Sequence, residues 1–94
     1  MIGRYRKKPL PVEVVYCVRW EYGGKEKNNF SDIQKLNGGS LRGLSVDDKG
    51  VLHIHTLYLE ELAYPGDYIV RDVWGELHAY RSALFESYYE PVTE

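Results

Sequence analysis

The segment PGDYIVRDVWGELHAY, residues 65–80, brings several side chains that could do chemistry into one short stretch. Asp67, Asp72 and Glu76 offer carboxylates, and His78 offers an imidazole. Paired carboxylates can act as acid and base in hydrolysis. Acidic residues at turns more often accept hydrogen bonds from backbone amides, however, and glycines punctuate this stretch at its turns. The pattern therefore favours an architectural hairpin over an active site.

Two further histidines lie on a predicted strand. His53 and His55 are two residues apart, so their side chains should share one face. They could hold two corners of a zinc site, with His78 or a carboxylate as the third ligand. No Cys-x-x-Cys or His-Glu-x-x-His pattern accompanies them. A solvent-facing strand is the alternative, and we expect neither a metal nor a cofactor.

Other catalytic patterns are missing from the sequence. Cys17 lies in the apolar run VEVVYCVRW and reads as a small core residue in a reducing compartment. No serine stands in a Gly-x-Ser-x-Gly elbow. Gly23-Gly24 falls in a polar loop and Gly38-Gly39 follows a helix, so neither is placed to cradle a phosphate. We therefore predict a protein that is not an enzyme.

Tyrosine and tryptophan favour binding instead. The chain has nine tyrosines and two tryptophans against two phenylalanines. Trp20 should anchor the core, whereas Trp74 stands beside a glycine at a corner, where a large ring is partly exposed. Aromatic and basic side chains could also clasp a small anionic ligand. The predicted binding residues are Trp74, Tyr80, Arg4, Arg6 and His78.

Length and charge set the class of protein. With 94 residues, we expect one domain over 1–94, with a basic arm over 1–9 that carries Arg4, Arg6, Lys7 and Lys8 and is solvated. A net charge of -2 makes a general nucleic-acid binder unexpected. No apolar run has the length of a signal peptide or a membrane span. These features predict a cytoplasmic protein with no membrane partner.

Periodicity predicts mostly strands. Residues 12–20 form a β-branched run in which Val12, Val14, Tyr16 and Val18 should face inward. Ser31 and Gln34 have capping-box spacing, which predicts one short helix ending near Asn37-Gly38. A hairpin over 41–59, strands within 68–80, a single helical turn over 81–87 and an extended end follow. The fold class is α+β: a small, strongly bent antiparallel sheet or partly open β-barrel of five to seven strands with one short helix.

The chain as a whole resembles small proteins of unknown function encoded in bacteriophage and prophage genomes. The resemblance rests on Arg6-Lys7-Lys8-Pro9, Val12-Glu13-Val14-Val15, Trp20, His55-Thr56-Leu57, Pro65-Gly66-Asp67-Tyr68-Ile69-Val70-Arg71, Gly75-Glu76 and Phe85-Glu86-Ser87-Tyr88-Tyr89-Glu90-Pro91-Val92. Many of those proteins have Tyr-Pro-Cys-Lys-Pro where this chain has residues 78–82, and lysine near position 74. This chain has no cysteine at residues 78–82, so we expect no activity that depends on that cysteine.

The resemblance implies a phage protein acting inside a bacterial cell. With no active site in the sequence, we expect a non-enzymatic accessory protein that binds a host factor and inhibits a host defence or regulatory system. A binder that sequesters a nucleotide-like anion, at a homodimer interface in one version, is the alternative. A metal-dependent enzyme using His53 and His55 is the third.

Overall fold

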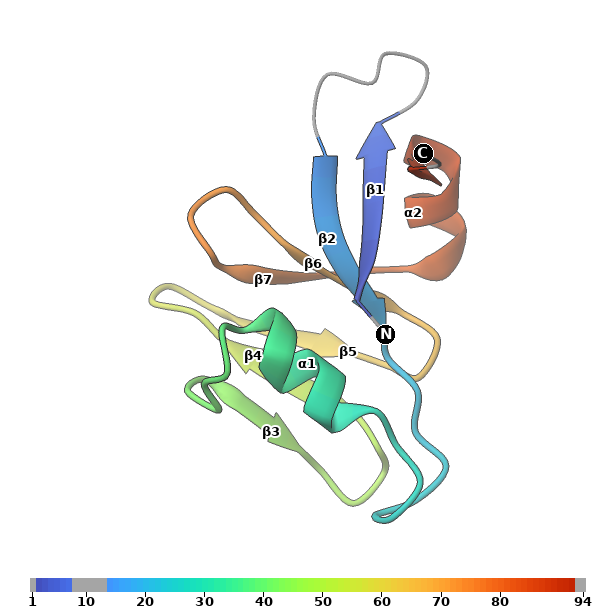
Figure 1. Ribbon diagram of the computed structural model, residues 1–94. Coiled ribbons are helices and arrows are strands. Elements are labelled where there is room, and N and C mark those ends of the chain that lie inside the picture. The colour runs from blue at the N-terminus through green and yellow to red at the C-terminus, as the bar shows by residue number, and fades with distance from the viewer. Residues whose placement is uncertain (1, 8–13, 93–94) are drawn as a thin grey trace.

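Strand β2 (Val14–Arg19) is the middle strand of a five-stranded antiparallel sheet in the computed structural model, which describes residues 2–7 and 14–92 (Figure 1). The strand order of this larger sheet is β7-β6-β2-β1-β8. Its other members are β1 (Gly3–Lys7), β6 (Tyr68–Arg71), β7 (Leu77–Tyr80) and β8 (Tyr89–Pro91).

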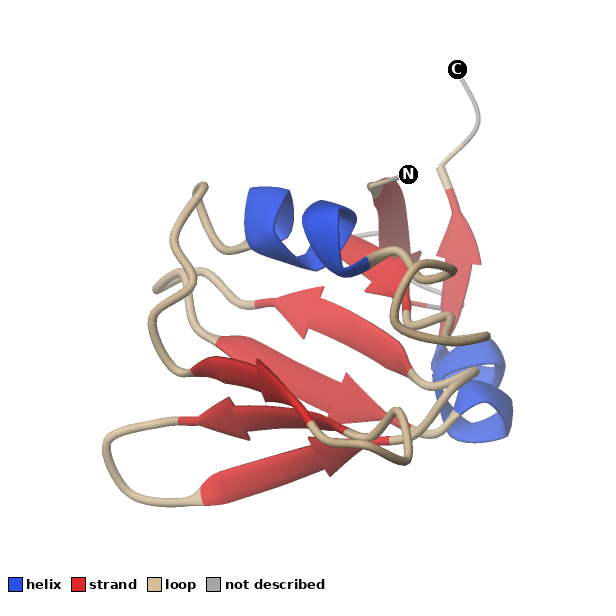
Figure 2. Ribbon diagram, turned by 90° about the horizontal axis from the view of Figure 1, so that it is seen from below, coloured by secondary structure: helices blue, strands red, loops and turns tan. Residues whose placement is uncertain are grey.

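A second antiparallel sheet has the order β3-β4-β5. It consists of β3 (Leu44–Val46), β4 (Leu52–His55) and β5 (Glu60–Ala63). Helix α1 (Phe30–Leu36) and helix α2 (Ser82–Tyr88) lie at separate sides of the strands, as Figure 2 shows. The predicted α+β class is confirmed, but the described residues form eight strands and two helices instead of five to seven strands and one.

Strand β2 is buried on both faces, which differs from the one-sided burial predicted for it. Val18 is buried as expected, but Tyr16 on the same face is 48% exposed. Val15 and Cys17 on the opposite face are buried. The cause is α2, which was predicted as a single turn: it places Phe85 against Val15 and Cys17 and so covers the second face. Burial raises the pKa of the Cys17 thiol to about 12, in keeping with its predicted role as a core residue.

Two hydrophobic clusters therefore share β2. The first lies between the two sheets and α1 and consists of Val18, Trp20, Ile33, Leu36, Leu52, Ile54, Ala63, Ile69 and Leu77. The second lies under α2 and consists of Val15, Cys17, Tyr68, Val70 and Phe85. Because side chains alternate along a strand, the odd and even positions of β2 serve different clusters. Trp20 belongs to the core, as predicted, and is fully buried.

Helix α1 buries Ile33 and Leu36, which the sequence predicted as its contacts with the sheet. The expected capping box is not formed, because the helix begins at Phe30 and Ser31 lies inside it. The side chain of Asn28 instead accepts a hydrogen bond from the Phe30 amide at 3.0 Å. Neither helix in the described part of the chain has the length and apolar character needed to cross a membrane.

Residues 3–7 do not form the solvated arm expected over 1–9. They form β1, which pairs with β2 on one side and β8 on the other. Residues 1, 8 and 9 lie outside the described residues. Most of the basic segment is thus a paired strand within the larger sheet.

The edge strands β5 and β7 of the two sheets are joined by a side-chain hydrogen bond, and the sheets do not close into a barrel. Glu61 on β5 accepts a hydrogen bond from the Ala79 amide of β7, with Oε1 3.0 Å from that nitrogen. A side-chain carboxylate thus satisfies a backbone donor that a further strand would otherwise pair. The same carboxylate reaches His78, one of the predicted binding residues.

Candidate functional site

Asp67, the first acidic residue of the 65–80 segment, has a structural role. It is buried, and its Oδ2 accepts hydrogen bonds from the Tyr64 amide at 2.9 Å and from Arg81 Nη1 at 3.0 Å. Its backbone carbonyl accepts the Trp20 amide at 2.8 Å. These bonds fix the turn at Pro65-Gly66, as the architectural interpretation predicts.

His78 lies between two carboxylates from different strands and turns. Its Nδ1 is 2.8 Å from Glu61 Oε2 on β5, and its Nε2 is 2.9 Å from Asp72 Oδ2 at the end of β6. Asp72 Oδ1 in turn accepts the amides of Trp74 and Glu76, each at 2.9 Å. The imidazole therefore connects the β6–β7 turn to the smaller sheet.

The carboxylates set the charge of this histidine. Partial burial by itself lowers the pKa of His78, but hydrogen bonds to Asp72 and Glu61 outweigh it, so the pKa lies above its usual 6.5. For Asp72, burial favours the neutral acid, but the bond to His78 and the two turn amides hold its pKa below the usual 3.8. The charged imidazolium–carboxylate pair is thus the favoured form between pH 3.8 and 6.5.

This pair should make folding stability depend on pH. The raised pKa of His78 gives stability that is complete below 6.5 and lost as pH rises through the folded pKa. The lowered pKa of Asp72 gives stability that is present above 3.8 and lost as pH falls through its folded pKa. His78→Gln should therefore cost about 1 kcal/mol between these limits, and less above them.

Urea unfolding of the wild type and His78→Gln across this pH range measures the difference directly. His53 titrates in both proteins, so subtraction removes its contribution. A difference that stayed constant from acid to alkaline pH would contradict the charged state assigned to His78.

Three side chains of this region could hold a metal ion. One ligand atom each from Asp72, Glu76 and His78 lies within 4.8 Å of the others. Both ring nitrogens of His78 are already engaged, however, and Asp72 also closes the turn. Binding a metal through Nε2 would break the Asp72 bond, so the arrangement is that of a structural ion pair.

His53 and His55 share one face of β4, as the sequence predicts, with ring centroids 6.5 Å apart. Glu60 lies between them, 3.4 Å from His53 Nδ1 and 2.9 Å from His55 Nε2. His53 Nε2 also contacts Asp47 at 3.0 Å, which raises the pKa of His53. Because Glu60 and the His78 partner Glu61 are neighbours on β5, they point to opposite faces. His78 therefore does not join the two histidines, and the three-histidine zinc set is not assembled. The carboxylate that lies with His53 and His55, as the other version of the predicted site requires, is Glu60.

Large apolar side chains are exposed at two neighbouring hairpin ends, a surface we call the tip patch. The β4–β5 loop contributes Leu57 and Tyr58, which are 82% and 89% exposed, together with Leu59. The β6–β7 turn contributes Val73 and Trp74, which are 74% and 85% exposed. Both hairpin ends lie at the left of Figure 1, and Leu57 lines one cavity with Gly75 of the turn. The tip patch is therefore the most exposed apolar surface of the described residues.

Basic side chains lie beside the tip patch on the larger sheet. Arg4, Tyr16 and Arg71 are direct partners across β1, β2 and β6, so their side chains share one exposed face. Lys35 of α1 lines a cavity with Tyr16 and Arg71. We call Arg4, Tyr16, Lys35 and Arg71 the basic face. Tyr16, Arg71 and Trp74 line a shared cavity of about 340 Å³, so the basic face continues into the tip patch.

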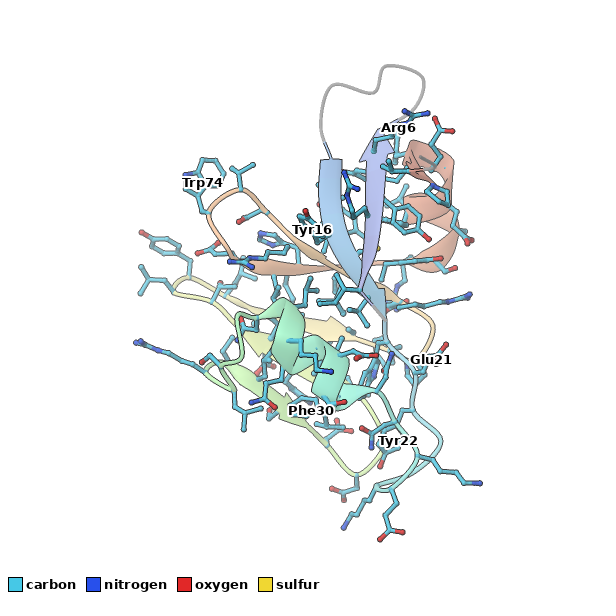
Figure 3. The ribbon with its side chains drawn as sticks, viewed as in Figure 1. Arg6, Tyr16, Glu21, Tyr22, Phe30 and Trp74 are labelled. Carbon is cyan, nitrogen blue, oxygen red and sulfur yellow. The ribbon has the colours of Figure 1, made fainter. Side chains whose placement is uncertain are left out.

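The predicted binding residues do not form a single site. Trp74 projects from the β6–β7 turn, far from Arg6 at the other end of the larger sheet (Figure 3). Arg6 lies 3.6 Å from Glu90. Tyr80 stands at the end of β7 with its ring 6.3 Å from that of Phe85, in the second cluster. Trp74 and His78 are linked because both bond to Asp72. Trp74 also shares a cavity with Tyr16 and Arg71, and Tyr16 pairs with Arg4 across the sheet.

Sequence reasoning missed most of the tip patch. Leu57, Tyr58, Leu59 and Val73 had been included in predicted strands and corners without a binding role. A usable signal was the apolar run directly before Glu60, because a strand that alternates up to His55 has no reason to continue with three apolar residues. The Thr56 hydroxyl accepts the Leu59 amide at 3.2 Å and ends the strand there.

These features define the class as a small α+β domain that exposes apolar side chains at two hairpin ends next to a basic sheet face. Comparison with known protein families, curated proteins and solved structures found no match for the chain.

Proposed function

We propose that the chain is a protein-binding domain that contacts its partner through the tip patch. The observation that carries the proposal is Trp74, whose side chain is 85% exposed on a turn held rigid by Asp72 and His78. Exposed tryptophan on a preorganised support is typical of the residues that dominate binding energy at protein interfaces.

The chemistry of the surface favours a protein over other ligands. Leu57, Leu59 and Val73 present aliphatic side chains, which fit an apolar pocket of a protein and do not stack on bases. Arg71 and Lys35 have no ion-pair partner among the described residues, and they can meet carboxylates at the edge of such a pocket. The proposed partner therefore has an apolar pocket rimmed by acidic side chains.

The resemblance to phage-encoded proteins supplies the context for this partner. In that context the partner is a host protein, and the domain acts as a non-enzymatic accessory protein that inhibits a host defence or regulatory system. The surplus of tyrosine and tryptophan supports this role, since both are enriched at interfaces.

Trp74→Ala should weaken partner binding by about 2 kcal/mol or more, roughly thirtyfold in Kd, while leaving the fold intact. The matched control is Leu84→Ala, which removes an apolar side chain that is 49% exposed on α2, away from the tip patch. Affinity capture from bacterial lysate with wild type, Trp74→Ala and Leu84→Ala identifies the partner, and titration gives Kd.

Retention of the same proteins by wild type and Trp74→Ala would contradict the role of the tip patch. Arg71→Ala adds a second criterion, because it should lower the salt dependence of binding without abolishing it. Together the variants separate the apolar contact from the electrostatic one.

The basic face supports a second candidate function, the binding of a small anion. Arg4 and Arg71 are the cross-strand neighbours of Tyr16, and Arg71 and Tyr16 line a cavity with Trp74. A nucleoside di- or triphosphate could stack on an aromatic ring and pair with arginine there. Thermal stabilisation by such nucleotides, lost in Arg71→Ala, would favour this function over protein binding.

A further inference from the structure

Strand β3 has an uncovered edge, in contrast to the other sheet edges. On β7 the Ala79 amide is bonded to Glu61, and β5 lies against β7 at the same seam. Strand β8 carries Pro91, which has no amide hydrogen. Strand β3 pairs with β4 alone. An exposed strand edge is a template for pairing with another extended chain.

The backbone pattern shows which groups of β3 are free. Gly43 accepts the His55 amide at 2.8 Å and Asp47 donates to Val51 at 3.0 Å, so these positions face β4. Backbone groups alternate in direction along an antiparallel strand, so Leu44 and Val46 face outward. The Leu44 amide is taken by Leu41, which leaves the Leu44 carbonyl and both backbone groups of Val46 without a bonded partner in the described part of the chain.

A groove runs along this edge. It has a volume of about 510 Å³ and is bounded on one side by β3. Tyr22, Phe30 and Leu41 provide apolar and aromatic surface on it, with Asp47 and Asp48 near one end of β3 and Lys25 also on the lining. Figure 3 places Tyr22 and Phe30 at the α1 end of the molecule, away from Trp74. The groove is thus separate from the tip patch and goes beyond the proposed function.

We propose that this groove binds an extended segment of a partner polypeptide, which adds to the smaller sheet as a strand beside β3. The free Leu44 carbonyl and the free amide and carbonyl of Val46 match the backbone groups of an extended chain. The groove volume of about 510 Å³ accommodates a few residues of one extended strand, so the proposed occupant is a peptide segment, and pairing with a second copy of the chain is an outcome of the test.

The lining specifies the sequence of that segment. Alternate side chains of the added strand face the same way, so every second residue should be apolar to pack on Tyr22, Phe30 and Leu41. A lysine or arginine should lie near Asp48, which is exposed beside Asp47. The occupant is therefore an extended peptide of alternating apolar pattern with a basic residue.

Val46→Pro tests the backbone pairing, because proline removes the outward amide hydrogen while β3 keeps its bonds to β4. Val46→Ala is the matched control, since it removes more side chain and retains the amide. The probe is a displayed library of short linear peptides selected on the wild-type protein. Selected peptides should bind Val46→Pro about tenfold or more weakly than they bind Val46→Ala, and should bind Trp74→Ala as they bind the wild type.

Hydrogen exchange gives a second measurement on the wild type, which covers the case in which Val46→Pro does not fold. The Val46 amide should become protected on peptide binding. The proposal is overturned if no selected peptide protects it, or if Val46→Pro folds and retains full affinity. It is equally overturned if β3 mediates a dimer of this chain, seen as self-association that Val46→Pro abolishes. Loss of peptide binding in Trp74→Ala would assign the peptides to the tip patch instead.

Discussion

Replacing Trp20 with alanine should lower the free energy of unfolding by about 3–5 kcal/mol. The Trp20 ring is fully buried between the two sheets and packs against Tyr22 and Phe30, with ring centroids 6.0 and 6.4 Å away. Its Nε1 donates a hydrogen bond to the Gly50 carbonyl at 2.8 Å. The substitution removes a large buried surface and leaves that carbonyl unpaired. The free energy of unfolding of a small domain is about 5–15 kcal/mol, so this loss is a large part of the total stability.

Urea unfolding followed by circular dichroism measures this loss. Trp20→Phe should fall between wild type and Trp20→Ala, because it keeps a six-membered aromatic ring and loses the five-membered ring with its hydrogen-bond donor. Trp74→Ala is the matched control, since the same residue type is removed from a position that is 85% exposed and should change stability by less than about 0.5 kcal/mol. Equal losses for Trp20→Ala and Trp74→Ala would contradict the burial assigned to Trp20.

Phe85→Ala should have the second large effect, about 3–5 kcal/mol, by emptying the centre of the cluster under α2. Phe85 is fully buried. Its ring stacks on Tyr68 at 4.2 Å and on Tyr89 at 4.7 Å, and it meets Tyr5 edge-on at 4.9 Å. Aromatic pairs of this kind add to the stabilisation that burial provides.

Thermal unfolding should show a fall in Tm of more than about 12 °C for Phe85→Ala. Leu84→Ala is the control within the same helix: Leu84 is 49% exposed, and alanine favours helix at least as well as leucine. If Leu84→Ala lowered Tm as much as Phe85→Ala, the stabilising role assigned to the buried Phe85 contacts would be contradicted.

The parts of the fold that the sequence predicts are those with a clear local period. The alternation of Leu52 and Ile54 with His53 and His55 predicts β4 and its faces, because one face of this strand is buried and the other is not. The buried face of α1 follows from Ile33 and Leu36 in the same way. In both elements only one face is buried, so the local sequence pattern is enough to identify that face.

The prediction fails where the burial or position of a strand depends on two hydrophobic clusters or on a contact distant in sequence. On β2 the apolar positions occur on both faces, so the sequence does not tell that α2 covers Val15 and Cys17. The order of the strands places β1 in the interior of a sheet because of its pairing with β8, near the other end of the chain. Composition alone made that segment look like a charged terminus.

The same limit applies to the candidate site. Trp74 could be chosen from its position beside Gly75, but its neighbours on the tip patch come from a loop whose proximity depends on how β5 meets β7. The partners of His78 are likewise split between Asp72, which is near in sequence, and Glu61, which is not. Local pattern finds the first member of each pair, and the sheet arrangement determines the second.

The position of the tip patch outside both hydrophobic clusters has a consequence for how this protein can evolve. Changes at Leu57, Tyr58, Val73 or Trp74 remove no core contact, so they are nearly neutral for folding. Under the proposed function, selection can therefore alter these residues and retarget the domain to a changed partner, while Trp20 and Phe85 maintain the scaffold. A protein in conflict with a varying opponent gains from this separation, because each new contact surface starts from a fold that is already stable.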